Sequence, residues 1–472
     1  MDFSQLHHLL KPDQILTGAA AMRGYDCDAY TVDRSAPAVV VLPESTQEVA
    51  AVVTWCHHNK VPFTARGAGT GLSGGALPAL GGVVISTKRL TKILAVDAAN
   101  HRLKAQTGIA NRKISDEVQH LGLHFAPDPS SQSVATLGGN IAENAGGPHT
   151  LKYGVTVQHI LGLTAVLPNG EIVEFGNLTG HEPGFDWLGI LCGSEGTLGI
   201  VTEAWVKLTP LPLHVATALI SFPSIRSATE CVASIIANGV LPAALEMMDK
   251  GIMDAVREAF NLQFHPDSLA LLLVECDGAI QDQVEAELKT IQQVCEQFGC
   301  IETTIAANEK ERAKLWMARK KGVGAMGRLA PTIVTHDCVI PRSKLPEMLD
   351  FVNAVGAKHG LGVANIFHAG DGNLHPFFYF DDREPGVIKK VVEAGEEIIR
   401  KCITLGGSIT GEHGVGVEKL DAMPLMFTPD DLNYQFKLKA VFDTESTCNP
   451  CKVLPNQKSC NEHRQRWRGT AW

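Results

Sequence analysis

Up to about residue 210, the apolar residues form short strand-like runs that alternate with glycine-rich turns and with two amphipathic helical stretches. The clearer stretch has four apolar residues at helical spacing, which are Val49, Val52, Val53 and Cys56. Because Ser45-x-x-Glu48 precedes them as a capping box, a helix is predicted to begin at Ser45. The second stretch, 113–121, ends at Gly122, and its predicted inward residues are Ile114, Val118 and Leu121.

The pattern changes after 208–213, where two prolines interrupt both a helix and a central strand. Strand-like runs at 216–222, 269–275 and 332–340 then alternate with long helical stretches. This alternation predicts a separate α+β domain. We therefore expect three parts: a first domain over 1–213, a second over 214–425, and a C-terminal segment, 426–472, that returns to the first domain.

Glycines gather in three loops of the first domain, at 66–78, 138–147 and 193–199. Glycine lets bare backbone approach a ligand, and consecutive N–H groups can cradle a diphosphate. These loops predict a large nucleotide cofactor. Gly69-x-Gly71-x-x-Gly74 matches the dinucleotide fingerprint, but Pro78 and the Gly81-Gly82 pair leave no room for the helix that this fingerprint needs. The sequence therefore disfavours a Rossmann domain and an NAD enzyme.

Two histidines flank a turn-forming segment of the second domain, between strand-like runs at 361–367 and 376–380. The segment reads His368-Ala-Gly-Asp-Gly-Asn-Leu-His375 and predicts a β-hairpin with both imidazoles at one mouth. Two histidines held in this way form half of a divalent metal site. Asp371, inside the turn, is interpreted as an aspartate that caps its own backbone.

An adjacent acid and imidazole, Glu412 and His413, lie in a second glycine-rich loop at 406–416, after a helix that should end near Leu405. Neighbouring residues in a loop cannot easily reach one metal together. We therefore interpret Glu412 as the third ligand of a set of two histidines and one carboxylate, which leaves His413 as a general base. Zinc is the expected metal, with manganese, iron and cobalt as alternatives.

The 472 residues carry a net charge of −10, which argues against a nucleic-acid-binding protein because such proteins need a basic face. No apolar run approaches the length of a membrane span, and the N-terminus lacks a basic segment followed by an apolar one. We therefore expect a cytoplasmic protein. A metal-dependent hydrolase would account for the histidines but not for the glycine loops.

The motifs together make the chain resemble the FAD-linked branch of the vanillyl-alcohol oxidase/p-cresol methylhydroxylase flavoproteins. Within it, the resemblance is strongest to glycolate oxidase D-subunits and D-lactate dehydrogenases, with D-2-hydroxyglutarate dehydrogenases as cousins. The motifs that carry it lie at 66–78, 127–131, 136–140, 144–147, 153–154, 193–201, 368–375, 411–414 and 448–450.

This resemblance implies a two-subdomain FAD-binding domain completed by the C-terminal segment, with an α+β substrate domain that caps the flavin. Some members attach FAD covalently through a histidine of the first loop; this loop has Thr70 and no histidine, so FAD should be non-covalent. The implied cofactor-binding residues are Arg66, Gly67, Ala68, Gly69, Thr70, Gly71, Ser73, Gly74, Pro127, Asp128, Thr136, Gly138, Gly139, Asn140, Asn144, Gly146, Gly147, Tyr153, Gly154, Glu195, Gly196, Thr197, Gly199, Ile200, Val201 and Asn449.

The resemblance also implies oxidation of a D-2-hydroxy acid, with Arg319 anchoring the carboxylate and Arg342 as a weaker alternative. Where the 2-hydroxyglutarate enzymes carry a lysine and an asparagine, this chain has Thr335 and Phe377, which disfavours a second substrate carboxylate. The expected substrate is therefore D-lactate or glycolate. The family's glycine after Asn449-Pro450 is replaced by Cys451, to which the sequence assigns no role.

Two alternatives stay open within the resemblance: a D-2-hydroxyglutarate-type dehydrogenase, and a non-catalytic FAD-binding subunit of a glycolate oxidase complex. The intact set of His368, His375, Glu412 and His413 disfavours the second. No cysteine cluster suits an iron–sulfur centre, so such a centre would belong to a partner. An iron–sulfur subunit, a quinone and a soluble carrier are all compatible electron acceptors. A homodimer and a hetero-complex both fit, and a partner could bring the protein to a membrane.

Overall fold

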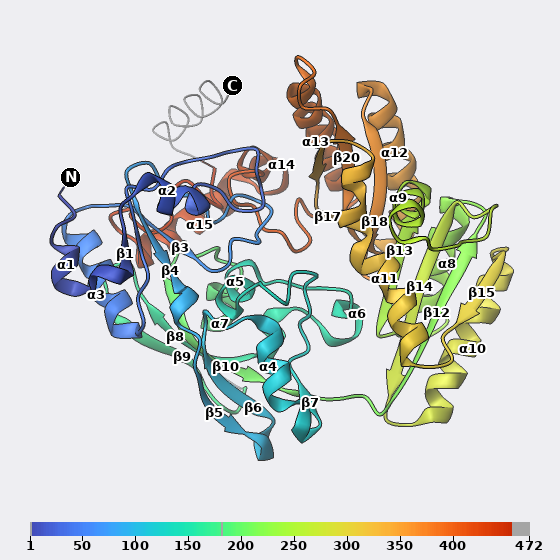
Figure 1. Ribbon diagram of the computed structural model, residues 1–472, viewed down its shortest axis with the longest axis horizontal. Coiled ribbons are helices and arrows are strands. Elements are labelled where there is room, and N and C mark those ends of the chain that lie inside the picture. Colours follow the sequence, from blue (N-terminus) through green and yellow to red (C-terminus); the bar gives the residue numbers. More distant parts are fainter. Residues whose placement is uncertain (1, 181–182, 456–472) are drawn as a thin grey trace. The chain divides into compact units, whose positions relative to one another are not determined.

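The computed structural model describes residues 2–180 and 183–455, and the chain forms two units (Figure 1). The first unit comprises 1–146, 155–211 and the chain from His413 onward; the second comprises 147–154 and 212–412. The chain leaves the first unit near the proline-rich segment at 208–213 that the sequence singled out. It returns at His413, earlier than the expected 426. The expected C-terminal segment, 426–472, is described only as far as Pro455.

The first unit contains a four-stranded sheet with the strand order β1 (Ile15–Leu16), β2 (Val39–Val41), β4 (Val83–Ser86) and β3 (Phe63–Arg66). A five-stranded antiparallel sheet has the order β5 (Ile93–Asp97), β6 (Arg102–Gln106), β10 (Ile200–Lys207), β8 (Ile160–Val166) and β9 (Ile172–Gly176). A further pair joins β7 (Leu123–His124) to β11 (Thr209–Pro210).

The helices of the first unit are mostly short. Within the described part of this unit they are α1 (Leu6–Leu9), α2 (Ala19–Met22), α3 (Thr46–His58), α4 (Asn111–Val118), α5 (Leu137–Glu143), α7 (Trp187–Leu191), α14 (Met423–Met426) and α15 (Pro429–Phe442). Helix α3 begins as predicted, because the Ser45 side chain accepts a hydrogen bond from the Glu48 N–H at 3.1 Å. Its four predicted inward residues are fully buried.

The second predicted helix is confirmed as α4, but one of its inward residues is not. Ile114 and Val118 are fully buried, whereas Leu121 is 42% exposed. The chain tightens into a 3₁₀ turn over Gln119–Leu121 before Gly122 takes the left-handed conformation. A 3₁₀ turn has a different residue period from an α-helix, so Leu121 rotates off the buried face.

The second unit is built around a nine-stranded sheet. Its main path runs β15 (Glu302–Ile305), β12 (His214–Phe222), β14 (Ala270–Gly278), β13 (Ala244–Asp249), β18 (Gly362–His368), β19 (Asn373–Leu374) and β17 (Cys338–Val339). Strand β20 (Pro376–Phe380) pairs with β18 and with β16 (Thr332–Thr335). The run predicted as one strand over 332–340 is therefore two strands, with His336 and Asp337 between them.

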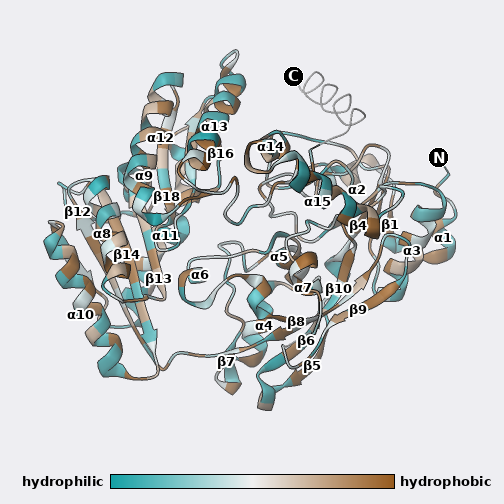
Figure 2. Ribbon diagram, turned by 180° about the vertical axis from the view of Figure 1, so that it is seen from behind, coloured by the Kyte–Doolittle hydropathy of each residue, from teal (hydrophilic) through white to brown (hydrophobic). Residues whose placement is uncertain are grey.

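Helices cover both faces of this sheet. Because side chains alternate between the two faces along each strand, neighbouring residues of one strand belong to different cores. Met247, Leu272 and Phe367 join a core with α8 (Ile225–Ala237), α10 (Gln281–Gln297), α12 (Leu345–His359) and α13 (Val387–Thr404). Their neighbours Met248, Leu271 and Ile366 face α9 (Lys250–Phe260) and α11 (Glu309–Ala325). Figure 2 shows the mixed hydropathy of α10, whose buried residues recur at helical spacing. The predicted helix end near Leu405 is confirmed, since Leu405 caps α13.

Candidate active site

The two predicted histidines meet at the mouth of a hairpin in the second unit. His368 is the last residue of β18 and pairs with Asn373, and His375 lies between β19 and β20. Their ring centres are 5.2 Å apart, and the rings are nearly perpendicular. Oε1 of Glu412 lies 3.3 Å from Nε2 of His368 and 3.0 Å from Nε2 of His375. Asp371 caps the turn, accepting a hydrogen bond from the Asn373 N–H, as expected.

A buried glutamate that the sequence did not single out orients the first of these histidines. Oε1 of Glu246, on β13, lies 2.7 Å from Nδ1 of His368, and its other carboxylate oxygen bonds Nε of Arg319. This hydrogen bond leaves Nε2 of His368 facing Glu412. A metal-binding histidine commonly bonds a carboxylate through its other ring nitrogen. Glu246 was detectable in principle, because it is the one acid inside the apolar run Ala-Leu-Glu-Met-Met of β13.

Asp337 holds the loop that carries the third side chain of the group. Its carboxylate accepts hydrogen bonds from the Thr410 hydroxyl at 2.5 Å, the Gly411 N–H at 2.8 Å and the Glu412 N–H at 3.2 Å. Oδ1 of Asp337 is also 3.7 Å from Nδ1 of His375. The fully buried Asp337 therefore fixes Glu412 and faces His375 from the side opposite the shared centre.

The charges around the two histidines favour a cation. Burial would lower the pKa of His368, but the carboxylates of Glu246 and Glu412 raise it well above its usual value. Burial likewise opposes ionisation of Glu412, yet the two histidines hold its pKa well below the ordinary range. The ligand atoms of His368, His375 and Glu412 all lie within 4.8 Å of one another. Two imidazole nitrogens and one carboxylate oxygen at this spacing suit a divalent transition metal.

Arg319 lies on α11 beside this group and is 5% exposed. Its Nε bonds Glu246, and among the described residues its two Nη atoms make no hydrogen bond. The fork end of the guanidinium is thus available to a carboxylate, which it can bind with two parallel hydrogen bonds. Arg342 lies in the 3₁₀ turn before α12, half-buried, with its backbone next to Gly372 of the hairpin turn. His413 follows Glu412 and is the first residue of the chain's return to the first unit.

Two of the predicted cofactor loops pack on one another in the first unit. A Cβ on Gly67 would lie 2.3 Å from Oγ1 of Thr136, so only glycine allows this approach. Thr136 caps α5, since its hydroxyl accepts a hydrogen bond from the Gly139 N–H at 3.2 Å. The surroundings of Gly71 are more open: a Cβ there would find its nearest atoms 3.7 and 4.0 Å away. The backbone near Gly71 can therefore approach a ligand.

Several side chains predicted to bind the cofactor bond the protein's own backbone. Arg66 donates to the carbonyls of Cys27 and Gly24. The side-chain amide of Asn449 donates to the carbonyls of Gly75 and Glu195. These contacts shape the loops, so any contribution of these residues to cofactor binding would pass through the backbone they hold. Cys451, at the family's glycine position, keeps a left-handed backbone with φ of 62°.

The other predicted cofactor residues remain in the first unit, except for those of the 147–154 segment. Asn140 donates to the side chain of Asn111, and the left-handed Asn144 accepts from the Val157 N–H. Ile200 and Val201 open β10. Gly138 lies in the first turn of α5. The remaining positions lie in the turns and loops between these elements; they are Ala68, Thr70, Ser73, Pro127, Asp128, Gly146, Gly196, Thr197 and Gly199.

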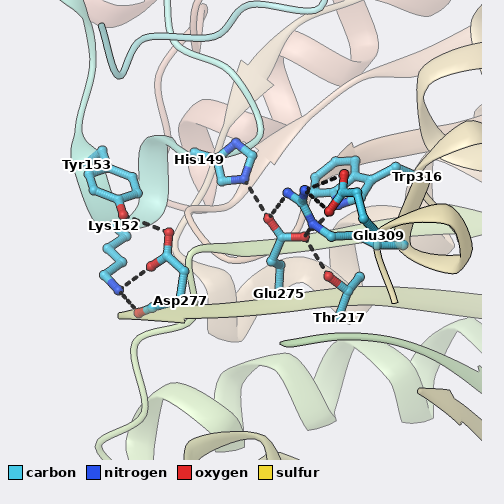
Figure 3. Close-up of polar contacts among 9 residues, drawn as sticks. His149, Lys152, Tyr153, Thr217, Glu275, Asp277, Glu309 and Trp316 are labelled. Carbon is cyan, nitrogen blue, oxygen red and sulfur yellow. Dashed lines mark hydrogen bonds and ion pairs between the residues drawn. The ribbon is translucent and has the colours of Figure 1, made fainter. Parts of the chain in front are cut away.

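The 147–154 segment, which contains α6 (Thr150–Tyr153), is fastened to the second unit by two acids of β14 (Figure 3). The hydroxyl of Tyr153 donates to Asp277 at 2.6 Å, and Lys152 forms an ion pair with the same carboxylate. His149 lies 3.2 Å from Glu275. The side chain of Tyr153, expected at the cofactor together with Gly147 and Gly154, is thus used in a protein contact.

Glu275 is a buried carboxylate surrounded by donors, and sequence reasoning missed it. Nε and Nη2 of Arg312 each lie 2.8 Å away, the Trp316 indole N–H 2.7 Å and the Thr217 hydroxyl 2.6 Å (Figure 3). Arg312, Trp316 and Arg319 follow one another at helical spacing on α11. Arg312 and Trp316, in the first turns of this helix, therefore bind Glu275, and Arg319, further along, binds Glu246.

Over the described part of the chain, no helix combines the length and apolar character needed to cross a bilayer.

Two family models match the sequence. One, described as the C-terminal domain of FAD-linked oxidases, matches residues 211–453, and an FAD-binding-domain model matches residues 37–176. Glycolate oxidase subunit GlcD of Escherichia coli (strain K12) is 40% identical over 438 residues, covering 93% of this chain and 88% of the relative. D-lactate dehydrogenase of Anaerostipes hadrus is 34% identical over 455 residues, covering 94% and 95%.

Solved structures share the fold at low sequence identity. p-Cresol methylhydroxylase with substrate bound aligns with a TM-score of 0.78 and 17% identity over 95% of both chains. Alkyldihydroxyacetonephosphate synthase aligns with a TM-score of 0.75 and 20% identity over 95% of this chain and 85% of the other. These likenesses confirm the expected two-domain, mixed helix-and-sheet FAD-binding fold.

Proposed function

Because the chain belongs to the family of FAD-linked oxidases, we propose that it oxidises a small D-2-hydroxy acid, D-lactate or glycolate, to the 2-oxo acid. The observation that carries the proposal is the meeting of His368, His375 and Glu412 at one point, backed by Glu246 and Asp337. A subunit that only bound FAD would have no use for this group.

His368, His375 and Glu412 are the residues that would hold a divalent metal, with zinc as first choice and manganese, iron or cobalt as alternatives. A cation there would attract the carboxylate and hydroxyl of the substrate and stabilise negative charge as the hydroxyl proton leaves. Glu246 and Asp337 keep the ligand atoms aimed at the shared centre. Arg319 binds the substrate carboxylate through its Nη atoms and fixes the orientation of the acid.

We assign His413 as the general base that takes the hydroxyl proton, because it follows a ligand directly and a neutral imidazole suits this role near pH 7. The loops at 67–75, 136–147 and 193–201 would hold FAD without a covalent bond. FAD, when bound, accepts the hydride from the carbon that bears the hydroxyl.

A small monocarboxylate is favoured over 2-hydroxyglutarate by a cross-strand pair. Thr335 on β16 lies directly opposite Phe377 on β20, and Phe377 is 6% exposed. A second substrate carboxylate next to a buried phenyl ring would lose its hydration without gaining a cation. D-2-Hydroxyglutarate therefore remains the second candidate.

Because relatives are named as glycolate oxidase subunits, we also propose that the chain works in the cytoplasm with a partner subunit that receives the electrons. An iron–sulfur subunit is one such acceptor, and a quinone and a soluble carrier are the alternatives to it. The partner could also bring the protein to a membrane.

The test is the anaerobic visible spectrum of the zinc-loaded protein, with D-lactate, glycolate and D-2-hydroxyglutarate added separately. Bleaching of the flavin bands by one of the first two acids, lost in His375→Ala, is the expected result. Bleaching by 2-hydroxyglutarate alone would replace the substrate assignment. Flavin bands that all three acids leave unchanged would contradict the proposed activity.

A further inference from the structure

Glu143 is the last residue of helix α5 in the first unit. Its Oε2 is buried and has no hydrogen bond among the described residues. The carboxyl lies against two glycine loops: a Cβ on Gly75 would be 2.9 Å from Oε1, and a Cβ on Gly414 would be 2.3 Å from Oε2. A buried polar oxygen without a partner is costly in a folded protein. A hydrogen-bonding group from outside the described residues would remove this cost.

A second carboxyl, that of Glu195, lies beside the first. A Cβ on Gly414 would be 2.7 Å from Oε1 of Glu195, so the two carboxyl groups contact the same glycine. The backbone N–H groups of Val415 and Gly416 donate to the two oxygens of Glu195 at 2.6 and 2.7 Å. When two carboxyl groups lie side by side, a charge on one strongly disfavours a charge on the other. The charge settles on Glu195, which has the donors, and the proton on Glu143, whose Oε2 accepts no hydrogen bond among the described residues.

The other charged groups of this region support that division. Burial, together with the charges of Glu195 and Asp28, raises the pKa of Glu143 well above its usual value, and Lys419 opposes this only in part. Asp28 already accepts hydrogen bonds from the Tyr30 and Ala76 N–H groups. Lys452 donates to the Leu77 carbonyl and to Asn449, and burial lowers its pKa to about 8.

A protonated carboxyl needs an acceptor for its O–H group, and the neighbouring Gly71 and Gly75 belong to the loop proposed to bind FAD. We infer that Glu143 acts as a neutral carboxylic acid and donates its proton in a hydrogen bond to FAD. This inference rests on the proposed function only in placing FAD at the 67–75 loop. FAD offers acceptors in its pyrophosphate and carbonyl oxygens. An ionised Glu143 would instead repel the pyrophosphate, so binding is coupled to this proton.

The test measures FAD dissociation from the full-length holoprotein, followed as the rise of free-flavin fluorescence on dilution. The comparison covers wild type, Glu143→Gln, Glu143→Ala and the exposed Glu117→Gln as a matched control in the same unit. Glutamine keeps a neutral donor that cannot ionise, whereas alanine removes the donor. All four proteins share Glu195, Asp28, Lys419 and Lys452, so differences between their pH profiles report on Glu143 alone.

We expect the Kd of wild type and of Glu117→Gln to rise with pH by up to about tenfold per unit above the pKa of Glu143. Glu143→Gln should show a flatter profile, and Glu143→Ala should bind more weakly at low pH. Identical profiles for wild type and Glu143→Gln would overturn the inference while leaving the proposed function intact. Wild-type protein that binds no FAD at any pH would overturn both.

Discussion

Replacing Glu275 by alanine should destabilise the second unit more than any single donor replacement around it. Thr217, Trp316 and Glu275 are 1%, 3% and 1% exposed, so the hydroxyl and the indole N–H would be left buried without an acceptor. Arg312 can still reach water and Glu309, so its loss contributes less. Two unsatisfied donors at roughly 1–2 kcal/mol each give about 3 kcal/mol. For a unit of this size, that lowers Tm by about 6–12 °C.

The assay is differential scanning calorimetry of the full chain at pH 7, with Thr217→Val as the matched control. That variant removes one hydrogen bond and should cost about 1 kcal/mol, which lowers Tm by about 2–4 °C. If Glu275→Ala shifted the transition no further than Thr217→Val, the idea that this carboxylate anchors α11 and the 147–154 segment would be wrong.

The same carboxylate should also make stability depend on pH. Burial raises its pKa, but hydrogen bonds from His149 and Arg312 outweigh burial and hold the pKa of Glu275 well below the usual 4.5. An acid with a depressed folded-state pKa contributes stability that is complete above the unfolded-state value and is lost as pH falls below it. The Tm difference between wild type and Glu275→Gln should therefore be constant above pH 4.5 and shrink below it.

Three further predictions concern the active site. His413→Ala should keep FAD and metal but lose about 10²–10⁴-fold in the rate of flavin reduction, and an unchanged stopped-flow rate would remove His413 from the mechanism. Glu246→Gln should weaken zinc affinity by about 10–100-fold in chelator competition, while unaltered affinity would show that His368 is oriented without it. Arg319→Lys should raise the KM for the hydroxy acid more than it lowers kcat, because lysine cannot form the bidentate pair; equal losses in both would contradict an anchoring role.

Sequence alone located the metal-binding candidates because chemistry and turn propensity coincide there. His368 and His375 flank glycines that can only form a turn, so their meeting followed from local geometry. Their partners are distant in the sequence: Glu246 precedes His368 by more than a hundred positions, and Asp337 precedes His375 by about forty. Only the order of the strands brings them close. Leu121 failed for a local reason, since one tightened turn rotated it outward. The bond between Tyr153 and Asp277 could not be predicted for a long-range reason, because Asp277 lies on β14, 124 positions further along the chain.

The way the chain is divided between the two units affects how it reaches its native state. Neither unit is a continuous stretch, since 147–154 joins the second unit and the chain after 412 rejoins the first. Residues near the end of the chain hold loops near its beginning. The side chain of Asn449 donates to the carbonyls of Gly75 and Glu195, and Cys448 forms a β-bridge with Phe63 of β3. Because synthesis proceeds from the N-terminus, nearly 450 residues must therefore leave the ribosome before the first unit can complete its fold. Until then the glycine loops lack their last backbone partners, so we expect cofactor capture to follow, not accompany, synthesis.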